Sequence, residues 1–335
     1  MRLIKIASYN LIFFIILILI FEVFFGYWFK DNNFGIYMRK ERRINWQTKA
    51  NFYGKEHNFF YKRNFWGFRG QELDPKDIKV VFEGGSTGNQ RYTPEHLTIV
   101  GLLNKKFEKI NGQKKIYNAS TDGKTVEGYV NDFLFWFPKI PQFNPEYVIF
   151  YVGINDRYKG EKHYDQKISF KKLDQLKDYV KNNSITIDKF KTIKNKHYPT
   201  NTLSYNFDNL KLYKNFDYYN YIKAKKIYKL PSEENLIQLK RFKLRLNKLE
   251  NIIDNNNYKP IFITQLMYNG LKDSNLYFVN EELKKFAQDN NFYLIPLDEI
   301  LEMDVHDFYD QIHTTPKGSK KIADTIYPYL TKYLY

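Results

Sequence analysis

The sequence contains no cysteine. Disulfide frameworks, thiolate metal sites and cysteine nucleophiles are therefore excluded. It also lacks a His-Glu-x-x-His pattern, so we expect no metal and no other cofactor. The composition, with 43% hydrophobic and 27% charged residues, excludes a wholly disordered chain, a collagen-like chain and a membrane protein with several spans.

Acidic residues are the scarcer charged class, since 53 Lys and Arg face 37 Asp and Glu, for a net charge of +16. A basic balance by itself favours anionic partners such as nucleic acid. No recognised nucleic-acid-binding motif accompanies it, so we expect no nucleic acid partner. The length of 335 residues allows one large or two ordinary domains.

The first thirty residues form the longest apolar run. Residues 6–20 carry no charge, and the run continues to Phe29 with one acid, Glu22. This is about the 20 residues that a helix needs to cross a bilayer, and Arg2 and Lys5 before it favour a cytoplasmic N-terminus. The exit, FFGYWFK, has no small-residue cleavage site. An uncleaved signal anchor over residues 1–29 is thus favoured over a cleaved signal peptide or a buried core helix. It would hold the protein in the inner (cytoplasmic) membrane, with the bulk outside the cytoplasm.

The rest of the chain alternates predicted strands with predicted helices. Residues 30–75 show no clear period and are interpreted as a stalk and packing segment. Short apolar runs then predict five strands, at 78–83, 114–120, 146–153, 259–265 and 292–297. Helices are predicted from Thr93-Pro94 to about Lys106, from Ser232 through 253, over 280–290 and after Thr315-Pro316. This alternation predicts one α/β domain over residues 76–335, with a five-stranded parallel sheet between two layers of helices.

Residues 161–230 interrupt the alternation. They contain sixteen lysines, seven acids and no glycine, which excludes a flexible Gly/Ser linker. We interpret them as an inserted, partly helical subdomain. Their charge is typical of a solvated face, and a surface for an anionic glycan or lipid headgroup is the alternative.

Four short motifs follow the predicted strands or precede the last helix. They are GGSTG at 84–88, NASTDG at 118–123, GIND at 153–156 and DQIH at 310–313. Open parallel sheets bind ligands at the carboxyl ends of their strands, so the motifs are expected to meet there. GGSTG lacks the lysine of a phosphate-binding loop, and each motif alone is weak. Together they supply every part of an acyl-transfer site.

The blocks FEGGSTG, NASTDG, GIND and DQIH, in this order, resemble the SGNH (GDSL-like) hydrolase superfamily of serine esterases and acyltransferases. The flanking GFRG and HTTPKGSKKIA resemble membrane-anchored bacterial members. The resemblance covers roughly residues 65–335 and implies a flavodoxin-like SGNH fold. Gly85 stands where the Asp of Gly-Asp-Ser would be, and the insertion has no counterpart.

The resemblance implies a role for each motif residue. Ser86 would be the nucleophile and His313 its base, with Asp310 holding the imidazole. The backbone N–H groups of Ser86 and Gly123 and the Asn155 amide would form the oxyanion hole. A serine hydroxyl needs such a base, and a tetrahedral intermediate needs such donors.

Other acids near these motifs are given different roles. Asp156 is expected to brace its loop. Asp304 and Asp307 lack the Asp-x-x-His spacing and are excluded from the site.

Two classes of function remain at this point. In the first, the protein is an esterase or acyltransferase acting on an acyl ester, with O-acyl groups of an envelope glycan as the natural substrate class. Water and a sugar hydroxyl are both open as the acyl acceptor. In the second, it is a non-catalytic factor for envelope polysaccharide binding or assembly with the same fold.

Overall fold

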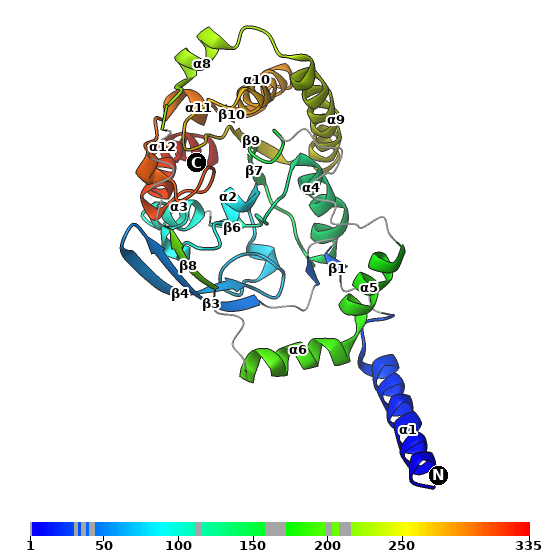
Figure 1. Ribbon diagram of the computed structural model, residues 1–335. Helices are drawn as coiled ribbons and strands as arrows, with labels where there is room; N and C mark the ends of the chain where they lie inside the picture. Colours follow the sequence, from blue (N-terminus) through cyan, green and yellow to red (C-terminus); the bar gives the residue numbers. More distant parts are fainter. Residues whose placement is uncertain are drawn as a thin grey trace.

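The computed structural model describes residues 2–29, 33–34, 38–39, 44–110, 115–157, 172–197, 203–207 and 216–335. Its centre is a five-stranded sheet in the order β10-β9-β7-β5-β6, in which every neighbouring pair is parallel (Figure 1). The five predicted strands are therefore confirmed. Their bounds are β5 (Val80–Gly84), β6 (Ile116–Asn118), β7 (Tyr147–Tyr151), β9 (Lys259–Ile263) and β10 (Tyr293–Ile295).

Successive strand residues enter two separate cores, one on each face of the sheet. In β5, Val80 and Phe82 join one core, whereas Val81 joins the other. In β7, Ile149 and Phe150 divide in the same way. A strand buried on both faces has an uninterrupted apolar sequence, which is why these runs could be recognised.

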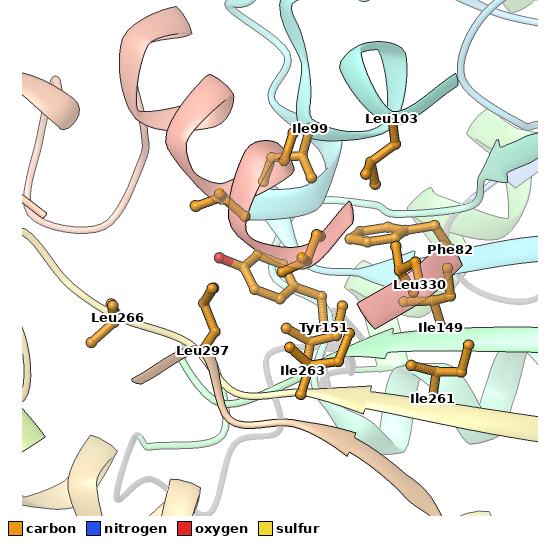
Figure 2. Packing of buried hydrophobic residues seen from close by; sticks show 14 of the residues in the cluster. Phe82, Ile99, Leu103, Ile149, Tyr151, Ile261, Ile263, Leu266, Leu297 and Leu330 are labelled. Carbon is orange, nitrogen blue, oxygen red and sulfur yellow. The ribbon is translucent and has the colours of Figure 1, made fainter. Parts of the chain in front are cut away.

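Helices cover both faces of the sheet. On one face, α3 (Ile99–Phe107) packs with α12 (Pro316–Leu334). Figure 2 shows this core, with Leu103 and Leu330 close to Phe82. On the other face, α9 (Glu233–Asn256) packs with α4 (Val126–Asn131) and with α10 (Ser274–Asp289). The architecture is a three-layer α/β/α fold, as the sequence predicts.

Two helix boundaries differ from the sequence predictions. Thr93-Pro94 does not open the long helix: Pro94 precedes the short turn η2 (Glu95–Leu97), and α3 begins after Thr98. Thr98 is the true cap, because its hydroxyl accepts the N–H of Gly101. Similarly, α10 begins at Ser274 rather than 280, since the Asp273 carboxylate caps its first turn.

Shorter elements connect these layers. Around the sheet, they are η1 (Pro75–Asp77), α2 (Ser86–Asn89), η3 (Asp132–Trp136), η4 (Phe137–Lys139), α11 (Leu297–Ile300) and η5 (Val305–Asp307). The predicted insertion contains α5 (Lys172–Asn183), α6 (Ile185–His197), β8 (Leu203–Phe207) and α8 (Tyr221–Ile227). Its residues 161–171, 198–202 and 208–215 lie outside the described part of the chain.

A second sheet lies beside the first, where the sequence showed no strand pattern. Strands β3 (Ile44–Phe52) and β4 (Lys55–Arg63) form an antiparallel hairpin, and β8 pairs parallel to β3. The turn between β3 and β4 places Tyr53 and Gly54 at positive φ. The hairpin falls in the range expected to be a stalk and packing segment. A further short pair, β1 (Asn33–Phe34) and β2 (Met38–Arg39), precedes it.

The N-terminal helix α1 (Arg2–Phe25) projects away from the body of the molecule (Figure 1). Its segment Ile4–Phe25 has a mean hydropathy of 2.4, and only 6% of that apolar window is buried. By length and composition it could cross a membrane, as an anchor or as a signal sequence.

Candidate active site

The structure brings Ser86, His313 and Asp310 into one chain of contacts. Ser86 is the first residue of α2, directly after β5, and the other two lie in the loop before α12. The distance from Ser86 Oγ to His313 Nε2 is 2.7 Å, and that from His313 Nδ1 to Asp310 Oδ2 is also 2.7 Å. The loop before the last helix therefore returns to the carboxyl edge of the sheet.

Asp310 uses its two carboxylate oxygens for different partners. Oδ2 faces the imidazole, whereas Oδ1 accepts the backbone N–H groups of Ile312 and His313 at 2.9 and 2.8 Å. Burial alone would raise the pKa of Asp310, but the hydrogen bonds from His313 and from these N–H groups bring it below its usual value. Asp310 is thus ionised at neutral pH. Its carboxylate can accept a hydrogen bond from the N–H of His313 Nδ1, which keeps the proton on that nitrogen and leaves Nε2 free to act as a base.

Tyr309 packs against the imidazole of His313. The two rings are nearly parallel, at 9°, with centroids 5.5 Å apart. Tyr309 packs in turn against Phe52 of β3 and Phe207 of β8, with ring centroids 5.3 and 4.1 Å apart. The hairpin and the insertion therefore form the wall behind His313, and nothing in the local sequence pattern marked Tyr309.

Two of the three expected oxyanion donors, Gly123 and Asn155, follow other strands of the sheet that carries Ser86. Gly123 follows β6 at φ +77, a conformation that glycine adopts without steric cost. Asn155 follows β7, and its side-chain amide donates to Lys124 O at 2.8 Å. No hydrogen-bond acceptor for the N–H of Ser86 or Gly123 is found within the described residues.

Gly85, beside the serine, leaves room for the side chain of Asn155. A Cβ added at Gly85 would lie 2.3 Å from Asn155 Nδ2 and 3.2 Å from Lys124 O. Asn155 thus occupies the space that a side chain at position 85 would need. Glycine at this position lets the amide approach the backbone of the serine turn.

Two buried glutamines connect the loops of the site, and sequence reasoning missed both. Gln90, at the end of α2, donates from Nε2 to Thr314 Oγ1 and to Ser319 Oγ at 3.0 and 2.5 Å. It therefore joins the serine helix to the segment just after His313. The sequence gives no signal for either glutamine beyond its position. Gln90 follows the serine turn, and the second glutamine, Gln265, ends the strand predicted over 259–265.

Gln265 makes the corresponding connection to the Asn155 loop. Its Nε2 donates to Thr87 Oγ1 at 3.0 Å, and its Oε1 accepts the N–H of Ile154 at 2.7 Å. The residue next to the serine and the residue next to Asn155 are thus held by one side chain.

A buried ion cluster lies under the site. Lys124 follows Gly123, and its ammonium group binds Glu83 at 2.8 Å, Asp132, and Ala119 O at 3.0 Å. Burial would lower the pKa of Lys124, but the carboxylates of Asp132 and Glu83 raise it above its usual value. Burial raises the pKa of Glu83 well above the usual carboxyl range. The cluster ties the Gly123 loop to β5, the strand that carries Ser86.

The other acids considered from the sequence have structural partners. Asp156 accepts from Arg245 Nε at 3.1 Å and from the N–H of Val126 at 3.3 Å, which braces α9 and α4. Asp304 binds Lys317 at 2.9 Å, and Asp307 binds Lys321. Within the described residues, no three His, Cys, Asp or Glu side chains are grouped so as to hold a metal ion.

Tyr92 and Arg91 lie beside the wall that the hairpin and the insertion form behind His313. Tyr92 approaches Tyr205 and Phe207, with ring centroids 4.0 and 5.6 Å away. Arg91 forms an ion pair with Asp122, the residue before Gly123. The site thus places a serine hydroxyl against an imidazole whose other nitrogen faces a carboxylate.

Comparison with known proteins gives one family. The model of the GDSL-like lipase/acylhydrolase family matches residues 64–326. No curated protein matches the sequence.

Solved structures with similar folds include a lipolytic G-D-S-L protein from Veillonella parvula, at 14% identity and TM-score 0.41, covering 76% of this chain and 99% of that chain. The structure of TesA follows at 12% identity and TM-score 0.45, with coverage of 76% and 98%. The esterase EstA from Pseudoalteromonas has 12% identity, TM-score 0.42 and the same coverage.

Proposed function

Because the chain belongs to the GDSL-like lipase/acylhydrolase family, we propose that it is a serine esterase or acyltransferase that works through Ser86, His313 and Asp310. The observation that carries this proposal is the continuous contact from Ser86 Oγ through His313 to Asp310, with two distances of 2.7 Å. The non-catalytic alternative would not need a serine hydroxyl in contact with an imidazole whose other nitrogen faces a carboxylate.

The geometry supports a two-step reaction. His313 Nε2 takes the proton of Ser86 as its Oγ attacks the acyl carbonyl carbon, while Asp310 stabilises the imidazolium. The N–H groups of Ser86 and Gly123 and the amide of Asn155 hold the negative oxygen of the tetrahedral intermediate. His313 then returns the proton to the leaving alcohol, which leaves an acyl group on Ser86. Water or a second hydroxyl, activated by the same imidazole, removes that acyl group.

For the substrate, we propose O-acyl groups of an envelope glycan. The aromatic pair of Tyr92 and Tyr205 of β8, which packs beside Tyr309, supports this choice, because aromatic rings offer an apolar face together with a polar hydroxyl. The apolar helix α1 supports a location at the cytoplasmic membrane, as an uncleaved anchor with the catalytic domain outside the cytoplasm.

Labelling with a membrane-impermeant fluorophosphonate tests both the nucleophile and its location. In lysed membranes, the probe should label the full chain and should not label Ser86→Ala. In intact spheroplasts the same labelling is expected, because the domain would face outward. Absence of labelling in lysed membranes from a folded chain would contradict the esterase, whereas labelling only after lysis would place the domain in the cytoplasm.

Replacing Asn155 with alanine should reduce turnover without unfolding the protein. The change removes one oxyanion donor, which costs on the order of 10²–10³ in kcat. Gly85→Ala should approach the same loss, because its Cβ would displace the amide of Asn155. The double variant should be little worse than Asn155→Ala, as both changes remove the same donor. Steady-state kinetics and melting temperatures measure this, and an unchanged kcat in Asn155→Ala would remove that residue from the site.

A further inference from the structure

The single acidic residue of the apolar helix α1, Glu22, is buried where the end of α1 contacts the start of α6 in the insertion. Glu22 lies one turn before the end of α1 and is 8% exposed. Its carboxylate accepts the hydroxyl of Ser184 at 2.6 Å and the N–H groups of Ile185 and Thr186 at 3.1 and 2.8 Å. These are the residues at which α6 begins, and first-turn N–H groups lack partners within their own helix. A carboxylate at a helix N-terminus is also favoured by the helix dipole.

Further contacts attach the residues that follow α1 to α5. The indole of Trp28 donates to Glu22 at 3.0 Å and packs edge-on against Tyr179 of α5, with ring centroids 5.7 Å apart. The N–H of Tyr27 donates to Asn183 O at 2.8 Å. The end of α1 is thus attached to α5 and α6 together, and in Figure 1 α6 runs across the direction of α1.

Helices α5 and α6 expose apolar side chains at helical spacing. On α5, Leu173, Leu176 and Val180 follow i, i+3 and i+7, and the first two are 63% and 57% exposed. On α6, Phe190 and Ile193 are 69% and 58% exposed. An apolar stripe along one helix face is normally buried against something.

The same helices are rich in lysine. Residues 172–197 contain seven lysines and three aspartates, and Lys181 and Lys189 are exposed. Apolar side chains combined with lysines are typical of a helix that lies in a membrane surface bearing anionic lipids. The long stems of lysines can follow the apolar face while their charges reach the headgroups.

We propose that α5 and α6 lie in the surface of the bilayer at the C-terminal end of α1, with their exposed apolar residues inserted among anionic lipids. Continuity with α1 places them there, because a helix that spans the membrane ends at the same surface. Trp28 and Tyr179 then occupy the interface that Trp and Tyr prefer. The proposal depends on α1 as a membrane anchor, and it is independent of the reaction at Ser86.

The test uses the absence of cysteine in this chain. We would place single cysteines by Leu176→Cys and Ile193→Cys, label each with an environment-sensitive fluorophore, and reconstitute the full chain in phosphatidylcholine–phosphatidylglycerol vesicles. Lipids with a nitroxide at known depth should quench both labels, at about 5–10 Å below the headgroups. Leu244→Cys on α9 is the matched control: Leu244 is 57% exposed and α9 lies away from α1, so its label should stay in water.

Three outcomes would overturn the proposal. Labels at 176 and 193 that remain as water-exposed as the control would show that the helices do not touch the bilayer. Labels that leave water without being quenched would show that a protein surface, such as a second copy, covers them. Equal label depth in neutral and anionic vesicles would contradict the role of anionic lipid. The expected result is deeper insertion in anionic vesicles, and the combined variant Lys181→Gln/Lys189→Gln should reduce this difference in depth.

Discussion

Alanine at Ser86 is expected to abolish nearly all hydrolysis of a small acetyl ester, and alanine at His313 should do the same. Each loss should be on the order of 10⁴–10⁶ in kcat, because a nucleophile without its base and a base without its nucleophile are both inactive. Asp310→Asn should lose about 10⁴, since an amide favours the wrong imidazole tautomer. The Ser86 Oγ to His313 Nε2 distance of 2.7 Å is the physical basis of this coupling.

The decisive comparison is the double variant Ser86→Ala/His313→Ala. It should be scarcely slower than either single variant, because the two residues act in one step. His306→Ala, in η5 shortly before the His313 loop, exposed and outside the triad, should keep full activity. Losses that multiply in the double variant would mean separate steps, and full activity in Ser86→Ala would refute the esterase proposal.

The second large effect concerns stability. Lys124→Met is expected to lower the free energy of unfolding by about 3–5 kcal/mol, because the Asp132 carboxylate and the Glu83 carboxyl group stay buried without the ammonium group that binds both. Side chains of all three residues are at most 2% exposed, so water cannot replace the lost partner. Chemical denaturation at pH 7 measures the loss.

Two further variants distinguish the loss of a buried ion-pair partner from the loss of a positive charge in general. Lys248→Met removes a lysine whose side chain is 56% exposed and whose ammonium pairs with Glu127, so it should cost about 0–1 kcal/mol. Replacing all three charges, as Lys124→Met/Glu83→Met/Asp132→Leu, should recover much of the stability. If Lys124→Met were no more harmful than Lys248→Met, the buried cluster would not hold the fold together.

The loss in Lys124→Met should also depend on pH. Burial raises the pKa of Glu83 and Lys124 opposes this, so removing Lys124 should raise the folded-state pKa of Glu83 further. A carboxyl group whose pKa is raised by folding loses stability as the pH rises from its ordinary, unfolded pKa toward its folded pKa. The deficit of the variant should therefore shrink as the pH falls toward the ordinary carboxyl pKa and be smallest below it.

The central sheet could be predicted from the sequence because its strands leave local apolar runs. The motifs after those strands, together with the family resemblance, also predicted that Ser86, His313 and Asp310 would meet, and the structure brings these three side chains into contact. A run such as YVIFY in β7 is apolar at every position because both faces are buried. The topology of parallel sheets then places whatever follows the strands at one edge, which brings Ser86, Gly123 and Asn155 together. The Asp310–His313 spacing needs only one turn of chain.

The β3–β4 hairpin could not be predicted in the same way. It is only partly buried, and β4 alternates between exposed and half-buried residues until its last positions. A short pattern of this kind does not differ from that of an irregular surface segment. Its pairing with β8 joins residues more than a hundred positions apart, which no local period records.

The sequence by itself determined the layers of the fold, the apolar N-terminal helix and the identity of the motif residues, because burial and strand order leave a local pattern. Only the tertiary structure decided how these residues are held. Tyr309 stacks on His313, Gln90 reaches Ser319, and Glu22 binds the start of α6. The contacts of Gln90 and Glu22 join segments that are distant in the sequence, so no local pattern records them.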